Sequence, residues 1–359
     1  MNLFFGITVA PYSVDFCNCL HEELRCRMFH IPQPPFEMAF DVEAAERRCR
    51  FPLERYEKRP GLRHFLALYR LVKAEKPERV FVSEFSLTAL RMLLIRRLLR
   101  QSFRIVSVCD DSPDMIRGND FSRLHRLARH WVPRWVDDLI LANPESLAWY
   151  RSRFGKGLYM TILSDERLLR QDYAAALERG RRLRDEYRLG ERPVVLFVGR
   201  LIPLKNLDAF LEAMCGVEAA AVFVGDGPLQ AHLEAKARKL GVRAVFTGRK
   251  EGLDLAAWYD LADVLVLPSL QEAFGAVTGE ALAAGCPVIV SSRAGSSFLV
   301  TEGENGSVID PDDRASFAAA LKRWTGASPA ARPLELRENL LPVSFRDLFE
   351  TLKEELAYA

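Results

Sequence analysis

Short, continuous apolar runs recur along the chain, and longer amphipathic stretches separate them. Such runs are typical of parallel strands that are buried on both faces of a sheet. The alternation of strand-like and helix-like stretches predicts βαβ units and therefore an α/β fold with parallel sheets. The strand-like runs occupy residues 79–84, 103–110 and 138–143 in the first half, and residues 193–198, 220–224, 244–248 and 264–268 in the second.

The length of 359 residues predicts two domains of ordinary size, and a hydrophobic content of 49% is enough for a core in each. We expect an N-terminal domain over residues 1–175, a C-terminal domain over 176–340 and a C-terminal helix over 341–359 that crosses back to the first domain. The start of the chain, residues 1–10, is apolar but has no basic segment before it, which favours a first strand over a signal peptide. No apolar run reaches membrane-spanning length.

The seven Cys residues are scattered, which favours a reduced, cytoplasmic setting. Cys17 and Cys19 lie close together, but no second pair completes a metal site. Charge differs between the halves: residues 1–186 hold 32 Lys and Arg against 25 Asp and Glu, and the remainder holds 18 against 23. A basic first half and an acidic second half indicate different partners for each.

Two carboxylates, Glu272 and Glu280, follow the strand-like run 264–268 and flank a turn at Phe274 and Gly275. Glu280 falls in a helix-like run whose N-terminus would present free N–H groups, and such groups bind anions. Carboxylates accept hydrogen bonds from hydroxyl groups. The arrangement is therefore typical of a site for a phosphate flanked by polyols, although two Glu residues at this spacing also occur as ordinary solvated side chains.

Two cations, Arg200 and Lys205, follow the run 193–198 and the turn at Gly199. Ligands of open α/β sheets bind at the carboxyl ends of the strands. Two cations at that edge, facing a helix N-terminus, predict a site for a diphosphate. The alternative is ordinary surface charge.

These residues belong to a set of motifs that resembles the C-terminal domain of the retaining glycosyltransferases of family 4, the glycosyltransferases group 1. The resemblance is dense over residues 190–325, and it implies the GT-B fold: two Rossmann-like parallel-sheet domains facing across a cleft. The motifs are Gly199-Arg200 with Lys205, Val-Gly-Asp-Gly-Pro at 224–228, Phe-Thr-Gly at 246–248, the run 262–269, the Glu pair within 272–288, and Glu-Gly-Glu-Asn-Gly at 302–306.

The resemblance implies a role for each residue of the second half. Glu280 would bind the ribose of a nucleotide-sugar, and Glu272 would hold hydroxyls of the donor sugar. Arg200 and Lys205 would neutralise the diphosphate, and cationic side chains would take the place of a metal ion, so no metal or other cofactor is expected. The amides of Gly275, Ala276 and Val277 would bind phosphate oxygens, and the turn around Arg249 would border the nucleobase.

The strand ends of the first half place Ser83, Glu84, Asp110, Asp111 and Asn143 along one edge. Asp110 and Asp111 are the acceptor-side candidates. The stretch 110–114 could also hold metal ligands or an acid/base pair, but for Ser112 and Asp114 we favour the start of a helix.

The chain departs from the family on this side. It has Ala-Pro-Tyr-Ser-Val-Asp at 10–15 where many relatives carry a Gly-rich loop, and no His stands at residues 109–110.

Two basic stretches, residues 89–100 and 123–135, combine Arg with Leu or Trp. Basic amphipathic helices with aromatic residues bind anionic membranes. For residues 89–100 we favour the alternative, in which the Leu side chains pack on the sheet and the Arg side chains are solvated. Nucleic acid is disfavoured as a partner, because the net charge is only +2 and no binding motif occurs.

The sequence therefore predicts an enzyme that moves a hexose from a nucleotide diphosphate-sugar to an acceptor hydroxyl with retention of configuration. The acceptor would be a glycan or a lipid-linked glycan of cell-surface polysaccharide or glycolipid synthesis. The expected location is the cytoplasm, with peripheral contact at the inner face of an anionic membrane. The alternatives are a non-catalytic protein that binds nucleotide-sugars or glycans, and a GT-B epimerase.

Overall fold

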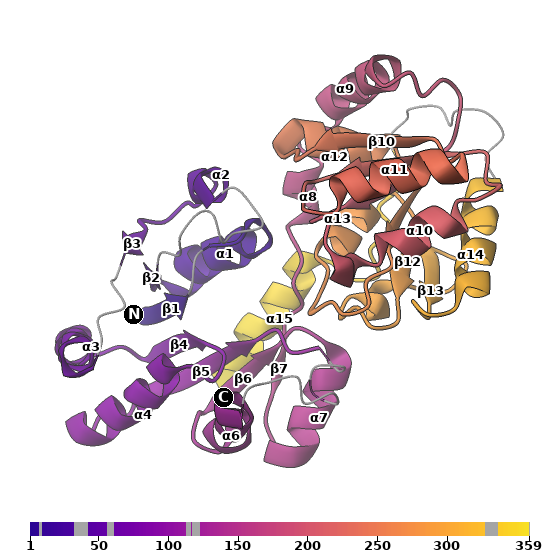
Figure 1. The fold of residues 1–359 in the computed structure, drawn as a ribbon. Helices are drawn as coiled ribbons and strands as arrows, with labels where there is room; N and C mark the ends of the chain where they lie inside the picture. The colour runs from indigo at the N-terminus through magenta and orange to yellow at the C-terminus, as the bar shows by residue number, and fades with distance from the viewer. Residues whose placement is uncertain are drawn as a thin grey trace. The chain divides into compact units, whose positions relative to one another are not determined.

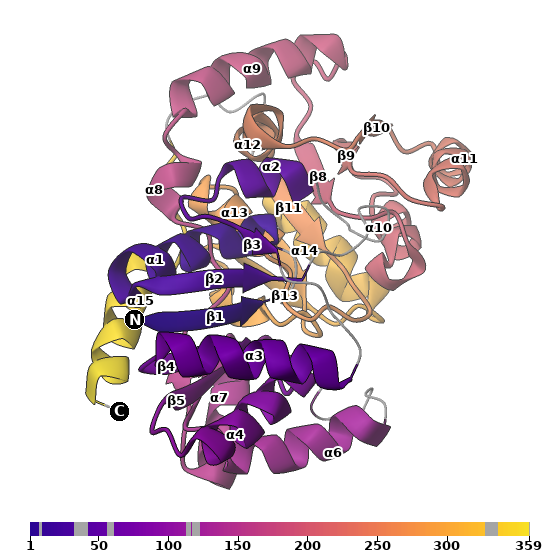
Figure 2. The ribbon, with the colours of Figure 1, turned by 90° about the vertical axis from the view of Figure 1, so that its left-hand side faces the viewer.

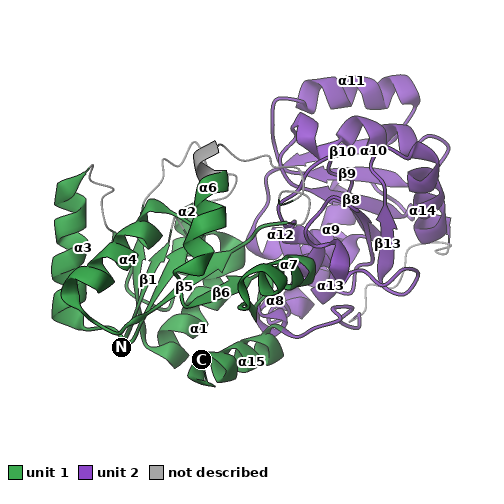
Figure 3. Cartoon of the chain, turned by 90° about the horizontal axis from the view of Figure 1, so that it is seen from below, with its two compact units in different colours: residues 1–164, 345–359 green, residues 165–344 purple. Residues whose placement is uncertain are grey.

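The structure, a computed structural model, describes residues 1–6, 9–31, 42–55, 61–112, 116, 123–326 and 337–358, without the side chains of 123–125. The chain forms two compact units, shown in separate colours in Figure 3. Unit 1 comprises Met1–Ser164 and Phe345–Ala359, and unit 2 comprises Asp165–Ser344. Both the N-terminal and the C-terminal part of the chain thus belong to unit 1.

Unit 1 is built on a seven-stranded parallel sheet with strand order β3-β2-β1-β4-β5-β6-β7 (Figure 1). Every neighbouring pair is parallel, as an α/β unit with helical crossovers requires. Its strands are β1 Asn2–Gly6, β2 Cys26–His30, β3 Glu54–Arg55, β4 Arg79–Ser83, β5 Arg104–Cys109, β6 Asp138–Leu141 and β7 Leu158–Tyr159.

Helices cover both faces of this sheet. Helices α3, α4 and α6 lie on one face and α1 on the other (Figures 1 and 2). The core on the first face joins Leu68 of α3, Met92 of α4, Val132 and Tyr150 to the strands. The helices of unit 1 are α1 Val14–Leu24, α2 Val42–Arg47, α3 Leu62–Glu75, α4 Leu87–Leu99, α6 Arg123–Trp131, α7 Pro144–Phe154 and α15 Phe345–Tyr358, with short 3-10 turns η1 Pro11–Ser13 and η3 Val132–Arg134.

Unit 2 repeats the architecture with a six-stranded parallel sheet of order β10-β9-β8-β11-β12-β13. Its strands are β8 Val194–Val198, β9 Ala220–Val224, β10 Ala244–Gly248, β11 Val264–Leu267, β12 Val288–Ser291 and β13 Gly306–Ile309. Its helices are α8 Glu166–Leu169, α9 Tyr173–Glu186, α10 Leu207–Ala213, α11 Gln230–Leu240, α12 Gly252–Leu261, α13 Val277–Ala283 and α14 Arg314–Gly326, with turns η4 Pro203–Lys205 and η5 Ser297–Leu299.

The predicted α/β class with two parallel sheets is confirmed, and the strand-like runs named above all form strands. The sequence pattern did not reveal β2, β3, β7, β12 and β13. Strand β2 alternates apolar residues with Arg27, so it lacks a continuous apolar run, and β3 and β7 have only two residues each.

The interpretation that the Leu side chains of α4 pack on the sheet holds for Leu93 and Leu99, which pack partly buried against the core, and is wrong for the other four. The buried residues of α4 are Thr88, Ala89, Met92 and Ile95. Leu87, Leu90, Leu94 and Leu98 are between 45% and 60% exposed. None of the helices within the described part of the chain is both long and apolar enough to cross a bilayer.

Candidate functional site

The carboxyl ends of β8 and β9 are joined by a close contact between two loops. The Gly199 N–H donates to the Val224 carbonyl oxygen at 2.9 Å, and the Leu201 N–H donates to the Asp226 carbonyl oxygen at 2.7 Å. A Cβ on Gly225 would lie 2.0 Å from the Gly199 carbonyl oxygen, so only glycine allows this approach. The second loop therefore fixes the backbone on either side of Arg200.

The loop after β11 is shaped by a second glycine. Gly275 has a φ of +92°, and a Cβ there would lie 2.5 Å from the Leu267 side chain. The loop pairs with the segment after β12: the Ser296 N–H donates to the Phe274 carbonyl oxygen at 2.8 Å, and Gly295 to Glu272 at 3.2 Å. Phe274 is buried and fills the space under the turn. The position of Glu272 is thus fixed by backbone contacts.

Lys205 and Glu272 form an ion pair between these two loops. The Ser269 hydroxyl also donates to Glu272 Oε2 at 3.3 Å. Only 15% of the Lys205 side chain and 16% of the Glu272 side chain are exposed, which makes this contact stronger than a solvated surface pair. The structure therefore brings together two residues that the sequence suggested for different parts of one ligand.

Helix α13 begins beside this pair. The N–H groups of Gly275, Ala276 and Val277 have no hydrogen-bond acceptor within the described residues, whereas the Thr278 N–H donates to Gly275 at 3.0 Å and the Glu280 N–H to Ala276 at 3.1 Å. The free donors at the start of a helix match the anion site that the sequence predicted.

Glu280 accepts a hydrogen bond of 2.7 Å from the hydroxyl of Tyr259 in α12. Tyr259 is 4% exposed, and burial, reinforced by the neighbouring Glu280 carboxylate, raises the pKa of its phenol well above the usual value. The phenol therefore stays a hydrogen-bond donor that orients Glu280. The sequence analysis missed Tyr259, although a buried Tyr hydroxyl requires a partner.

The other two cations of the site lie at its surface. Arg200 and Arg249 are exposed. Arg249 donates to Glu251 at 2.9 Å through its Nε atom. Both side chains are therefore accessible to a charged ligand, but Arg249 would first have to leave Glu251.

In unit 1, the two acceptor-side candidates have different environments. Asp111 is 2% exposed, pairs with Arg129 and accepts a 2.8 Å hydrogen bond from the Tyr150 hydroxyl. Asp110 is half-buried. Asp111 therefore stabilises the structure at this edge of the sheet through its buried partners, and Asp110 is the more accessible carboxylate. Arg129 belongs to the basic stretch 123–135, but it is buried and cannot contribute to a membrane-binding face.

Glu84 lies at the same edge, directly after β4. Its φ of 49° is in the left-handed region, which a residue with a side chain adopts at a cost. The Glu84 N–H donates to the Val108 carbonyl oxygen at 2.8 Å, which holds it beside β5. Burial, together with the charges of Asp110 and Asp111, raises the pKa of Glu84 to about 7.

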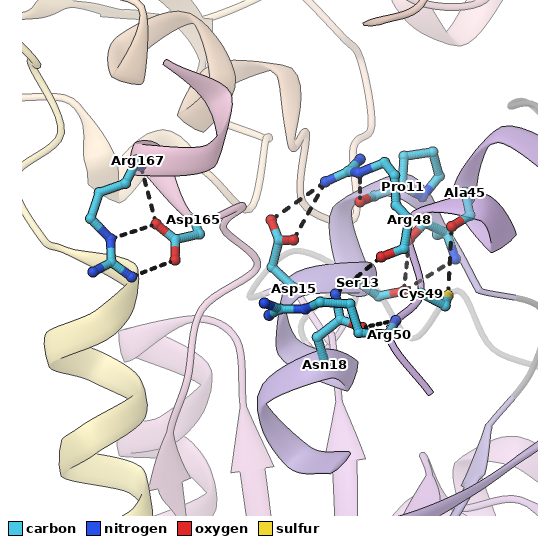
Figure 4. Close-up of polar contacts among 11 residues, drawn as sticks. Pro11, Ser13, Asp15, Asn18, Ala45, Arg48, Cys49, Arg50, Asp165 and Arg167 are labelled. Atoms are coloured by element: carbon cyan, nitrogen blue, oxygen red, sulfur yellow. Dashed lines mark hydrogen bonds and ion pairs between the residues drawn. The ribbon is translucent and has the colours of Figure 1, made fainter. Parts of the chain in front are cut away.

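The loop after β1 has a specific local structure in place of a Gly-rich loop. The Ser13 hydroxyl donates to the Ala10 carbonyl oxygen at 2.9 Å and accepts from the Ala10 N–H at 3.1 Å. Figure 4 shows Arg48 pointing toward Asp15 and the Pro11 carbonyl oxygen, at 3.5 Å and 3.3 Å. Side-chain hydrogen bonds thus hold the backbone of residues 10–13 in this segment.

No group of three or more His, Cys, Asp or Glu side chains suited to a metal ion occurs among the described residues. The sequence contains an Asp-x-Asp triplet, Asp310-Pro311-Asp312, but both carboxylates face the guanidinium of Arg293.

Comparison with known proteins links this geometry to a family. Residues 192–326 match the family model described as glycosyl transferases group 1. The D-rhamnosyltransferase WbpZ of Pseudomonas aeruginosa is 34% identical over 233 residues, which are 62% of this chain and 58% of that protein. A GDP-mannose-dependent phosphatidylinositol monomannoside mannosyltransferase of Mycobacterium tuberculosis is 35% identical over 178 residues, which are 45% of each. The matches thus cover less than two thirds of either relative.

Solved structures extend the likeness to the whole chain. The Anabaena protein Alr3699/HepE, in complex with UDP, has a TM-score of 0.78 at 17% identity, and the match covers 100% of both chains. The apo lipopolysaccharide outer core galactosyltransferase WaaB has a TM-score of 0.68 at 17% identity, over 99% of this chain and 100% of that one. Residues 192–326 therefore carry the sequence pattern of the glycosyl transferases group 1, and the chain as a whole has the GT-B fold.

Proposed function

We propose that this protein is a retaining glycosyltransferase that transfers a hexose from a nucleotide diphosphate-sugar to an acceptor hydroxyl. The observation that carries the proposal is the presence of three features at one edge of the unit 2 sheet. These are the Lys205–Glu272 pair, the N–H groups of residues 275–277, and Glu280 with its Tyr259 partner. They lie in the segment that matches the glycosyltransferase family.

Each part of the donor has a chemically matched partner in this proposal. The diphosphate binds the N–H groups at the start of α13 together with Lys205 and Arg200, and these donors stabilise the charge that develops on the leaving group. Glu280 accepts hydrogen bonds from the ribose hydroxyls, and Arg249 borders the base. A diphosphate competes with Glu272 for Lys205, so donor binding frees the Glu272 carboxylate to hold the sugar hydroxyls.

The acceptor would bind to unit 1. Asp110 is the accessible carboxylate at the carboxyl edge of that sheet, and Glu84 lies beside it. One relative with the matching segment is named for mannosyl transfer to phosphatidylinositol monomannoside, a glycolipid, which supports a glycan or lipid-linked glycan as acceptor. We place the reaction in the cytoplasm, at the inner face of a membrane.

Calorimetry with UDP, GDP and ADP, followed by turnover with the corresponding sugar nucleotides, tests this proposal. Glu280→Gln should weaken binding of the free nucleoside diphosphate, because its partner is the ribose. Glu272→Gln should not weaken that binding, because the diphosphate then no longer competes with a carboxylate for Lys205. It should lower turnover, because the partner of Glu272 is the transferred sugar. Equal losses of nucleotide affinity in the two variants would refute these roles.

The same experiment separates an enzyme from a binding protein. The loop after β1 and the residues at 109–110 differ from the family pattern, which favours a non-catalytic nucleotide-sugar protein as the second candidate. Tight donor binding without hydrolysis or transfer in the wild-type protein would support that candidate. Absence of binding to all three nucleotides would exclude both.

A further inference from the structure

Exposed apolar side chains are concentrated on three neighbouring elements of unit 1. Nine of the sixteen large hydrophobic residues that are exposed in the described part of the chain belong to α3, α4 or the α6–η3 segment. They are Leu62, Leu66, Leu87, Leu90, Leu94, Leu98, Leu127, Trp131 and Trp135, and we call the surface that they form the α3–α4–α6 surface. Contiguous exposed apolar area of this kind marks an interaction site more often than a solvated face.

The three elements share one face of the sheet. Helix α4 packs beside α3, and Arg96 of α4 donates to the Trp135 carbonyl oxygen at 3.0 Å, which ties α4 to the end of the α6–η3 segment. Figure 2 shows the three helices on the same side of the strands. The exposed side chains therefore belong to neighbouring elements on one face of the sheet.

Helix α4 is the centre of this surface. Leu87, Leu90, Leu94 and Leu98 follow one another at intervals of three and four residues, so they form a single stripe along the length of the helix. The opposite side, with Met92 and Ile95, packs on the sheet. The stripe would lie flat against a planar partner.

The charges around the stripe have one sign. Residues 62–76, 87–100 and 123–135 contain twelve Lys and Arg but a single carboxylate, Glu75. Glu75 is paired with Arg27. Two of the cations, Arg96 and Arg129, are held by Asp137 and Asp111. The exposed cations are Arg63, Arg70, Lys73, Lys76, Arg97, Arg100, Arg126 and Arg134.

The two exposed indoles, Trp131 and Trp135, belong to the α6–η3 segment that Arg96 ties to α4. The Arg134 guanidinium lies 5.4 Å from the centre of the Trp131 ring, and Trp135 is 63% exposed. Indoles beside cations are typical of proteins at the headgroup level of a bilayer, where one end of the side chain is apolar and the other hydrated.

We propose that the α3–α4–α6 surface docks on an anionic lipid bilayer, with α4 parallel to the membrane plane and its Leu stripe among the lipid headgroups. An apolar stripe and the cations around it are the two components of protein binding to the surface of an anionic membrane. A second copy of the chain fits less well, because a twofold contact would set cations against cations. A nucleic acid would neutralise the cations but leave the Leu stripe in water.

The biological role of this docking rests on the proposed function, because docking would hold unit 1 next to an acceptor that is carried by a lipid. The surface itself is separate from the donor site of unit 2. Vesicle binding in the absence of any nucleotide therefore tests the surface, and nucleotide binding in the absence of vesicles tests the function.

The test is co-sedimentation with vesicles of phosphatidylcholine, with and without phosphatidylglycerol, at low and high salt. The wild-type protein should bind only the anionic vesicles, and binding should weaken with salt, because the Debye length is about 8 Å at physiological ionic strength. Each cation at an anionic surface strengthens binding about five-fold. Arg97→Glu with Arg100→Glu should therefore weaken it about 25-fold or more.

The matched control is Arg238→Glu with Lys239→Glu, which makes the same charge change at exposed positions in the last turn of α11 in unit 2. It should leave vesicle binding nearly unchanged. Leu90→Ala with Leu94→Ala keeps the charge and the helix propensity, and should weaken binding at least ten-fold through lost apolar burial. Thermal unfolding of each variant, compared with that of the wild type, reports whether unit 1 is folded.

Three outcomes would overturn the proposal. The first is a wild-type protein that stays in the supernatant at low salt. The second is equal loss of vesicle binding in the α4 and α11 charge variants, which would indicate net charge alone. The third is a dimer in analytical ultracentrifugation that Leu90→Ala with Leu94→Ala dissociates, which would assign the surface to a second copy of the chain.

Discussion

At the scale of single residues, the site depends on a lysine and a glutamate that hold each other in place. Lys205 and Glu272 lie on separate loops and are mostly buried, so the loss of either leaves an uncompensated charge. The ion pair fixes both side chains at the start of α13, where the N–H groups of residues 275–277 converge. A substitution of Lys205 or Glu272 should therefore change both the affinity for the ligand and the structure of the site.

Replacement of Lys205 by Ala should weaken the binding of a nucleoside diphosphate. A charge-assisted hydrogen bond contributes roughly 1.5–3 kcal/mol, and the unpaired Glu272 would in addition repel the phosphates. Titration calorimetry should show a loss of about ten-fold or more. Lys205→Ala with Glu272→Gln should recover part of it, and identical affinities in the wild type and Lys205→Ala would remove Lys205 from the site.

Glu84 gives unit 1 a pH-dependent stability. Its pKa is raised from 4.5 to about 7, so between these values the folded state keeps a proton that the unfolded state has lost. The stabilisation is complete below pH 4.5 and is lost as the pH rises through 7. Glu84→Gln should therefore unfold like the wild type at pH 5 but be more stable at pH 8, by up to about 3 kcal/mol.

Asp260→Asn in unit 2 is the matched comparison, because burial also raises the pKa of Asp260 to about 7. Thermal unfolding at pH 5, 6, 7 and 8 should show the effect of each variant in the transition of its own unit. A Glu84→Gln protein that loses stability at pH 8 would show that the Glu84 carboxylate is needed in its charged form.

The sequence predicted the candidate site residues that belong to motifs, but not the residues that reach the site or its partners only through packing of distant elements. The ordered motifs named Lys205, Glu272 and Glu280 without any structure. Tyr259 lies on another helix and reaches Glu280 only through the fold. The pairing of Arg129 with Asp111 is equally non-local, and a run of Arg residues gave no sign that one of them is buried.

At the scale of elements, long apolar strands were predictable and short or edge strands were not. Strands β8 and β9 are apolar throughout, and β4 and β5 are apolar apart from Arg and Ser, because both faces of their sheets are covered. Edge strand β3 has two residues, Glu54 and Arg55, and no sequence pattern marks it. The exposed stripe of α4 escaped prediction because Leu follows a helical period on both sides of that helix.

Because the loops after β8 and β9 contact each other, we predict that a substitution of Gly225 in the second loop weakens ligand binding at Arg200 in the first. Gly225→Ala would set a Cβ 2.0 Å from the Gly199 carbonyl oxygen and displace the backbone beside Arg200. Nucleoside diphosphate binding should weaken roughly ten-fold, or about 1.4 kcal/mol. Calorimetry and thermal unfolding measure the two effects in the same preparation.

Gly241→Ala is the control, because Gly241 also has a positive φ, +67°, but no atom lies within 4 Å of the added Cβ. It should lose roughly 1–2 kcal/mol of stability and keep full affinity. If Gly225→Ala also keeps full affinity, the loop contact does not position the site.

At the scale of the whole molecule, the chain passes from unit 1 to unit 2 and returns. Helix α15 packs on α1 and β7, and its residues Phe345, Phe349, Leu352 and Leu356 are buried. Arg79, the first residue of β4, donates to the Leu356 carbonyl oxygen at 2.7 Å. Glu23 of α1 pairs with Arg346 and Lys353 of α15. The last helix in the sequence is therefore part of the first unit.

Deletion of residues 345–359 should unfold unit 1 and spare unit 2. Each of the four buried side chains contributes about 1.5–3 kcal/mol, a total close to the whole stability of a domain, about 5–15 kcal/mol. Calorimetric scanning should lose one transition, while binding of a nucleoside diphosphate to unit 2 persists. Deletion of residues 358–359 alone, where Tyr358 is 91% exposed, should change neither. Survival of both transitions in the long deletion would show that α15 is dispensable, and loss of nucleotide binding would show that the donor site needs unit 1.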